Sequence, residues 1–322
     1  MYRIGIDLGG TNIVAGIVDN NFKIVAKLST PTNANRSSED ITMDIASLCK
    51  NVCIENGIDF ADIDAIGVAS PGAVNNKTGV VEYSCNLPFR SYPIVDELKK
   101  LTGKEHIYID NDANAAAWGE AIVGAAKGSS HSIMITLGTG VGGGIVINGR
   151  VESGFNGAGG ELGHIVIEKG GRPCSCGRCG CWEAYSSATA LIKMTQEKID
   201  ECKAQNRPTA LNELVEKAGK VSGKTAFDGM RLGDEAAKEV VDTYLDYLAC
   251  GLANIINIFQ PEIISIGGGV SNEGDELVKA LLPRVRKEQY GCGLGFPLTD
   301  LRIAQLKNDA GVIGAATLGI NI

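Results

Sequence analysis

The chain has 322 residues, of which 44% are hydrophobic and 21% charged, and its formal net charge is −8. This composition is that of a globular protein and excludes disordered, collagen-like and coiled-coil classes, while the length predicts two domains. Its acidity and its 5% aromatic content argue against nucleic acid as a partner. Neither a leader peptide nor a long apolar span is visible, so we expect a cytoplasmic protein with no membrane partner.

The first predicted element is a pair of strands that the chain repeats later. Residues 3–20 read RIGIDLGGTNIVAGIVDN, and residues 132–149 read SIMITLGTGVGGGIVING. Both segments alternate apolar residues, break at a turn of glycine and threonine, and resume, which predicts strand, turn and strand. Matched residues lie 129 positions apart before a one-residue gap and 128 after it, far more than in a solenoid, so the repeat indicates two domains that begin with similar topology.

The two turns predict a phosphate-binding site. Gly9-Gly10-Thr11 and Gly138-Thr139-Gly140 allow backbone N–H groups to approach an anion closely, since glycine has no Cβ atom. One turn in each domain would hold a polyphosphate across an interdomain cleft. Asp7 precedes the first turn, and a carboxylate beside phosphates suits Mg²⁺. The alternative for Asp7 is an aspartate that hydrogen-bonds within its own turn.

Strands and helices alternate through the rest of the chain. Strands are predicted at 65–69, 107–109 and 263–266, and helices at 113–126, 234–257, 275–286 and 309–318. This mixture predicts an α/β fold, in which ligands bind beyond the ends of the strands. The segments that follow the three strands are Ser70-Pro71-Gly72, Asp110-Asn111-Asp112 and Gly267-Gly268-Gly269.

Asp110-Asn111-Asp112 lies between a predicted strand and a predicted helix. Aspartate and asparagine at this position cap a helix by accepting its free N–H groups. One of two aspartates suffices for a cap, so the other carboxylate could serve as a general base toward a hydroxyl. The local sequence leaves both interpretations open.

Four cysteines fall within eight residues, and a histidine precedes them. The cluster reads Cys174-Ser-Cys176-Gly-Arg-Cys179-Gly-Cys181, and Glu161-Leu-Gly-His164 lies upstream. Thiolates and imidazole at such spacing predict a tetrahedral zinc site, with an iron–sulfur cluster as the alternative. There are five candidate ligands for four positions.

Together these residues resemble the ROK family of bacterial sugar kinases, within the actin-like ATPase superfamily. The most specific part of the resemblance is Glu161-x-x-His164 followed by Cys174-x-Cys176-Gly-x-x-Gly-Cys181-x-Glu183. The resemblance covers essentially the whole chain and implies two actin-like, ribonuclease H-like domains with a cleft between them. The expected bounds are 1–112 for a small domain and 113–304 for a large domain carrying the zinc loop, with a C-terminal helix at about 305–322 that packs back on the small domain.

The resemblance also implies a role for each site residue. Asp112 would be the general base that accepts the proton of the attacking sugar hydroxyl, and Mg²⁺ would accompany ATP near Asp7. The residues implied in sugar binding are Ser70, Gly72, Asn86, Asn111, Asp112, Glu161, His164 and Glu183. Those implied in ATP binding are Asp7, Gly9, Gly10, Thr11, Gly138, Thr139, Gly140, Gly267, Gly268 and Gly269. Structural zinc would bind His164, Cys174, Cys176 and Cys181, with Cys179 at a variable position.

Among the family's activities, the spacing and the cysteine loop are most similar to those of glucokinases, which phosphorylate the 6-hydroxyl of glucose. Kinases for N-acetylmannosamine, N-acetylglucosamine, allose or fructose share much of the pattern. The family's repressors carry a helix-turn-helix module before the first hairpin, which here starts at residue 3, so we expect a kinase. ATP is favoured over polyphosphate, because no basic surface run is evident. An alternative from another class is an actin-like ATPase activator with an iron–sulfur cluster. A homodimer or homotetramer is expected.

Overall fold

The computed structural model describes residues 1–320 and contains two compact units. The first comprises Met1–Met134, Gly143–Gly160 and the C-terminal segment from Ala304, and the second comprises Ile135–Gly142 and Glu161–Ile303. By its contacts helix α3 (Asp112–Ile122) belongs to the first unit, whereas the family resemblance implies a domain boundary directly before residue 113. Strands β9 (Ser132–Leu137) and β10 (Val141–Ile147) are each divided between the units.

The first unit is built on a five-stranded sheet with the order β3-β2-β1-β4-β8. The strands are β1 (Tyr2–Leu8), β2 (Asn12–Val18), β3 (Ile24–Pro31), β4 (Ile63–Ser70) and β8 (Ile107–Asn111). The first hairpin is antiparallel, and β1, β4 and β8 run parallel. Their carboxyl ends therefore meet at one edge of the sheet, which also holds the first glycine turn.

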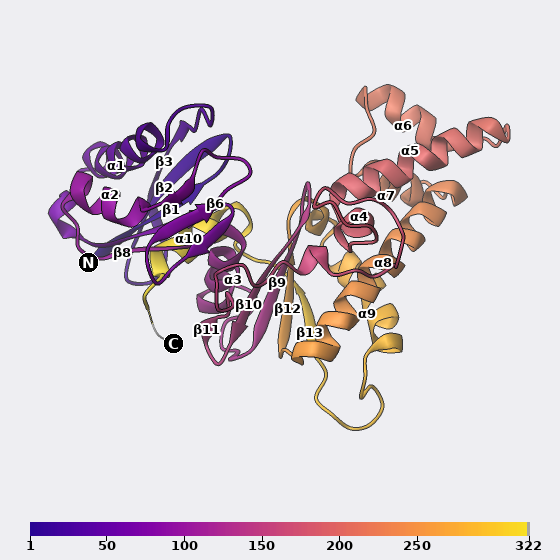
Figure 1. The fold of residues 1–322 in the computed structure, drawn as a ribbon. Coiled ribbons are helices and arrows are strands. Elements are labelled where there is room, and N and C mark those ends of the chain that lie inside the picture. Colours follow the sequence, from indigo (N-terminus) through magenta and orange to yellow (C-terminus); the bar gives the residue numbers. More distant parts are fainter. Residues whose placement is uncertain (321–322) are drawn as a thin grey trace. The chain divides into compact units, whose positions relative to one another are not determined.

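Helices cover both faces of this sheet. They are α1 (Ser38–Glu55), α2 (Ile94–Thr102), α3 (Asp112–Ile122) and α10 (Ala310–Thr317). Alternate residues of β1 point to opposite faces. Ile4 and Ile6 are fully buried in one core with Ile41 and Ile45 of α1. On the other face a Cβ atom at Gly5 would lie 1.9 Å from the Val312 carbonyl oxygen, so α10 packs directly against the backbone of β1 (Figure 1).

A small sheet and short elements complete the first unit. The sheet has the order β5-β6-β7 and consists of β5 (Ala73–Asn75), β6 (Val80–Tyr83) and β7 (Arg90–Tyr92). The short elements are the 3₁₀ turns η1 (Phe60–Asp62) and η4 (Lys307–Asp309) and the strand β11 (Arg150–Val151).

The second five-stranded sheet has the order β11-β10-β9-β12-β13. Its remaining strands are β9 (Ser132–Leu137), β10 (Val141–Ile147), β12 (Ile263–Gly267) and β13 (Asp300–Ile303). The helices of the second unit are α4 (Glu183–Ser186), α5 (Ala188–Ala204), α6 (Ala210–Ala218), α7 (Thr225–Arg231), α8 (Glu235–Phe259) and α9 (Asp275–Glu288), with 3₁₀ turns η2 (Leu162–His164) and η3 (Gly269–Glu273). The predicted α/β class is confirmed. None of the helices among residues 1–320 is long and apolar enough to cross a membrane.

One predicted boundary is wrong. The sequence predicts a helix over 113–126, but α3 ends at Ile122. The fully buried carboxylate of Glu120 accepts the backbone N–H of Ala125 at 2.6 Å. Gly124 and Ala126 both donate to the Glu120 carbonyl, so the chain after α3 folds back as a turn.

Candidate active site

Asp112 is the first residue of α3, directly after the carboxyl end of β8. The cap of α3 is Asn111, whose side-chain oxygen accepts the N–H groups of Ala113 at 2.9 Å and Asn114 at 3.3 Å. Neither aspartate is therefore the cap residue. Burial raises the pKa of the Asp112 carboxyl, partly offset by a hydrogen bond from the Ala113 N–H at 2.9 Å. Asp112 is exposed, so a substrate can reach its carboxylate, and a raised pKa makes that carboxylate a better proton acceptor.

The end of β4 lies beside the Asp112 segment. Ser70 pairs with Asn111 in the parallel register of β4 and β8. The Asn111 side-chain amide donates to the Gly72 carbonyl at 3.1 Å. Gly72 has a φ of +104°, and a Cβ atom there would lie 2.1 Å from the Tyr83 carbonyl oxygen, so glycine is required. These contacts fix the backbone beside Asp112.

Asp110 is buried behind these residues, with 3% of its surface exposed. Its carboxylate accepts the side-chain amides of Asn114 at 2.9 Å and Asn76 at 3.0 Å. It also accepts the backbone N–H of Asn111 at 2.7 Å. Burial raises the pKa of Asp110, and the three donors oppose that rise. Asp110 thus connects β8, α3 and the loop after β5.

Asp7 and the first glycine turn lie at the same sheet edge. Burial, and then the charge of Asp112, raises the pKa of Asp7 to about 6. The two carboxylates therefore interact, and a cation would relieve their repulsion. The turn is held by Thr32, whose hydroxyl donates to the Gly9 carbonyl at 2.6 Å. A Cβ atom at Gly10 would lie 3.6 Å from Cβ of Asn86, which places Asn86 beside this turn.

The second glycine turn connects β9 and β10 within the second unit. Gly138 donates its N–H to the Gly140 carbonyl at 3.0 Å and closes the turn. A Cβ atom at Gly138 would meet no atom within 4 Å, so the space beside it is open. Gly268 follows β12 with a φ of +83°, and a Cβ atom there would lie 2.5 Å from the Leu137 carbonyl oxygen. The 267–269 segment therefore lies directly against the start of the turn.

Four potential metal ligands converge in the loop before α4. Ligand atoms of His164, Cys174, Cys176 and Cys181 all lie within 4.8 Å of one another. Sγ of Cys176 is 3.6 Å from Sγ of Cys181, and Sγ of Cys174 is 3.6 Å from Nδ1 of His164. Thiolates bound to one tetrahedral zinc ion lie about 3.8 Å apart, given a Zn–S bond of about 2.3 Å. The separations fit such a site.

Cys179 lies outside this group, and its backbone forms an isolated antiparallel β-bridge with Pro173. Burial raises the pKa of the Cys181 thiol to about 12. A bound metal ion would reverse that shift, since a coordinating thiol is deprotonated.

The carboxylates that flank the metal loop differ in their surroundings. Glu161 is exposed, and its Oε2 lies 4.0 Å from Nε2 of His164, the ring nitrogen away from Cys174. Glu183 is half-buried and accepts the Ser175 hydroxyl at 3.2 Å. Its other oxygen accepts the backbone N–H of Val141 at 3.1 Å.

The structure groups the predicted site residues by unit. The first unit holds Asp7, Gly9, Gly10, Thr11, Ser70, Gly72, Asn86, Asn111 and Asp112. The second holds Gly138, Thr139, Gly140, Glu161, His164, Cys174, Cys176, Cys181, Glu183 and Gly267–Gly269. Sequence reasoning missed Thr32, Ser175, Ala188 and Thr189, which contact the turns or Glu183. Isolated serine, threonine and alanine residues carry no local signal for such contacts.

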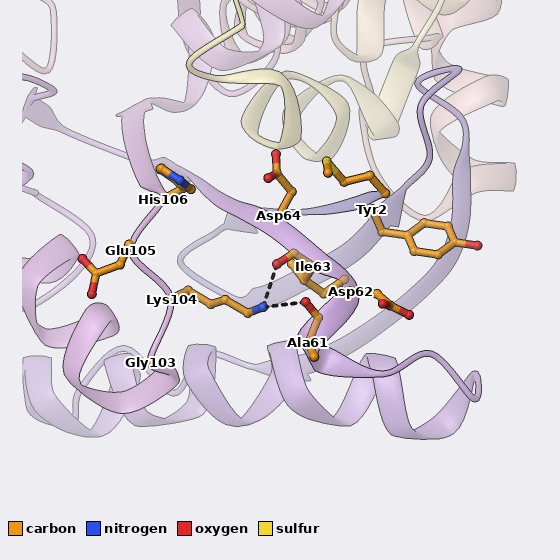
Figure 2. A pocket seen from close by; sticks show the side chains of 10 residues that line it. Tyr2, Ala61, Asp62, Ile63, Asp64, Gly103, Lys104, Glu105 and His106 are labelled. Atoms are coloured by element: carbon orange, nitrogen blue, oxygen red, sulfur yellow. Dashed lines mark hydrogen bonds between the residues drawn. The ribbon is translucent and has the colours of Figure 1, made fainter.

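A separate surface depression of about 650 Å³ lies at the opposite end of β4 (Figure 2). Lys104 crosses it and donates to the carbonyls of Ile63 at 2.6 Å and Ala61 at 3.3 Å. Its ammonium group therefore links the segment before β8 to η1 and the start of β4. The predicted site residues all lie elsewhere.

Comparison with known proteins identifies the family. The model of the ROK family matches residues 3–321. A glucokinase of Halalkalibacterium halodurans is 39% identical over 98% of this chain and 94% of its own length. A glucokinase of Thermotoga maritima is 37% identical over 98% of this chain and 96% of its own length. A ROK family glucokinase from Streptomyces griseus, solved with glucose and AMPPNP, is 33% identical, with a TM-score of 0.80 and 99% of both chains covered. The predicted actin-like fold is thereby confirmed, and the chain belongs to the ROK family.

Proposed function

We propose that this protein is an ATP-dependent glucokinase that transfers the γ-phosphoryl group of ATP to the 6-hydroxyl of glucose. The observation that carries the proposal is the match over 99% of both chains to a glucokinase that binds glucose and AMPPNP. Glucokinases that are 39% and 37% identical over nearly the whole chain support it.

In this proposal Asp112 is the general base. Its accessibility and its place at the joint carboxyl ends of β4 and β8 support this role. Phosphoryl transfer requires in-line positioning and charge neutralisation, and the base needs only to accept the proton of the attacking hydroxyl. Asn111 would bind a sugar hydroxyl, because the Gly72 carbonyl takes only one of its two amide hydrogens.

The residues proposed to bind the sugar are those that the family resemblance implies. Ser70, Gly72 and Asn86 would shape one side of its site, and Glu161, His164 and Glu183 would bind its hydroxyls. His164 supports this assignment by its geometry. Its Nδ1 faces Cys174 and its Nε2 faces Glu161, so one ring nitrogen can serve a metal while the other serves the sugar.

ATP would bind at the two glycine turns, with residues 267–269 against the adenosine. The open space beside Gly138 supports close approach of a phosphate. Asp7 would hold Mg²⁺, usually through water, and the ion would neutralise charge on the transferred phosphoryl group. We further propose that His164, Cys174, Cys176 and Cys181 hold zinc, which would fix the loop that carries the sugar ligands. The donor set of one nitrogen and three sulfurs is typical of structural zinc.

The test is a coupled assay of ADP release with a panel of glucose, N-acetylmannosamine, N-acetylglucosamine, allose and fructose. We expect the highest kcat/KM with ATP and glucose, and colourless protein that contains zinc. The matched control is the Asp112→Asn variant, which should show almost no release with any sugar. Greater kcat/KM for another sugar would replace glucose as the substrate. Visible iron–sulfur absorbance without sugar-dependent ADP release would instead support an ATPase activator.

A further inference from the structure

Three residues in the segment after the metal loop bind the second glycine turn. The Gly138 carbonyl accepts the Ala188 N–H at 2.8 Å, and the Thr139 carbonyl accepts the Thr189 hydroxyl at 2.8 Å. The Val141 N–H donates to Oε2 of Glu183 at 3.1 Å. The bonded residues are 50, 50 and 42 positions apart in the sequence, and all of them belong to the second unit. The turn is therefore anchored by the start of α4 and α5.

Gly140 shows how closely Glu183 approaches the turn. A Cβ atom at Gly140 would lie 2.3 Å from Oε2 of Glu183, well inside van der Waals contact. At Gly138 the same test finds no atom within 4 Å. The two glycines thus have different surroundings. The space beside Gly138 is empty, whereas the space beside Gly140 is occupied by the carboxylate of Glu183.

The other oxygen of Glu183 faces the metal loop. Oε1 accepts the Ser175 hydroxyl at 3.2 Å and lies 3.7 Å from Sγ of Cys174. One carboxylate therefore contacts both the turn and the loop. The Glu183 oxygen accepts the Val141 N–H, so this contact can fix the orientation of the Val141 peptide.

We propose that Glu183 is a positioning residue for the 138–140 turn and sets its backbone for the donor phosphates, in addition to any contact with the sugar. The proposal rests on the proposed function insofar as the turn binds ATP. It predicts that loss of Glu183 weakens nucleotide binding in the absence of sugar. A residue that binds only sugar would not have this effect. Preorganised backbone donors bind an anion without reorganisation, which is why a loosened turn should lose affinity.

The experiment measures the Kd of Mg·AMPPNP by calorimetry, without sugar, for the original protein and four variants. Glu183→Ala should weaken binding about tenfold, equivalent to about 1.4 kcal/mol. Glu183→Gln retains an oxygen acceptor for the Val141 N–H and should stay within about twofold of the original protein. Glu216→Ala, the matched control, removes an exposed carboxylate on α6 of the second unit and should leave the Kd unchanged.

Amide hydrogen exchange at Val141 provides a readout that does not depend on any ligand. Faster exchange in Glu183→Ala, with exchange in Glu216→Ala unchanged, would support the proposal. Equal Kd values and equal Val141 exchange in the two alanine variants would overturn it. Gly140→Ala is a second test in case Glu183→Ala folds poorly. Its methyl group would displace the Glu183 carboxylate, so nucleotide binding should weaken as in Glu183→Ala. Unchanged nucleotide binding in Gly140→Ala would also count against the proposal. Absence of nucleotide binding in the unmodified protein would contradict the proposed function, while Val141 exchange would still test the positioning role.

Discussion

The carboxylate of Asp110 accepts the side-chain amide of Asn114 at 2.9 Å in the buried space behind Asp112. The same carboxylate accepts two further donors, from Asn76 and from the backbone of Asn111. A buried carboxylate is stable only when its oxygens are satisfied in this way. The buried carboxylate of Asp110 thus fixes the segment that carries Asp112, the proposed base.

Asp110→Asn should therefore destabilise the protein. The amide nitrogen would replace one carboxylate oxygen and face either the Asn76 amide or the N–H groups of Asn114 and Asn111, so at least one donor would lose its partner. We expect a loss of about 1–3 kcal/mol in the free energy of unfolding. Urea denaturation followed by circular dichroism would measure it. Unchanged stability would show that the three hydrogen bonds contribute little.

Asp112→Asn should retain the fold but lose turnover. The side chain of Asn111, not that of Asp112, caps α3, so the start of the helix is preserved. We expect kcat for glucose phosphorylation to fall at least about 100-fold, the usual scale for a general base, with the Kd of AMPPNP unchanged. Near-normal turnover in the purified variant would exclude Asp112 as the base.

Asp7 should make the stability of the ligand-free protein depend on pH. Folding raises the pKa of Asp7 from 3.8 to about 6. Between pH 3.8 and about 6 the folded state keeps a proton on Asp7 that the unfolded state has lost, so stability falls as the pH rises through this window. Above pH 6 the ionised carboxylate would cost on the order of 3 kcal/mol. Asp7→Asn should therefore raise the melting temperature at pH 7.5, with no gain below pH 4. Thermal scans across this range would test it, and an equal gain at every pH would assign the effect to packing.

Cys179→Ser should retain one zinc ion per chain, because Cys179 lies outside the group formed by His164 and the other three cysteines. Cys174→Ser, Cys176→Ser and Cys181→Ser should each lose the metal and bind glucose more weakly. Elemental analysis of the four purified variants decides the ligand set. Zinc that is lost from Cys179→Ser but kept in Cys181→Ser would contradict it.

The sequence alone predicted the elements that have strong local patterns. Period-two alternation located β1, β2, β9 and β10, and short apolar runs located β4, β8 and β12. Helix α1 was not assigned, although Ser37 caps it and Asp40 lies in its first turn, so an available signal was overlooked. The end of α3 could not be predicted, because it depends on the buried side chain of Glu120 and the fold-back at Ala125.

Residue types and their spacing determined the family and the candidate chemistry, because a motif such as Glu161-x-x-His164 can be recognised directly in the linear sequence. The tertiary structure decided which groups meet. It separated Cys179 from the other three cysteines and placed Glu183 against Val141, 42 positions earlier in the chain. It also gave Gly138 and Gly140 different surroundings within one turn. Local sequence cannot specify such contacts, because they depend on the path of the chain between the partners and on the packing that fixes it.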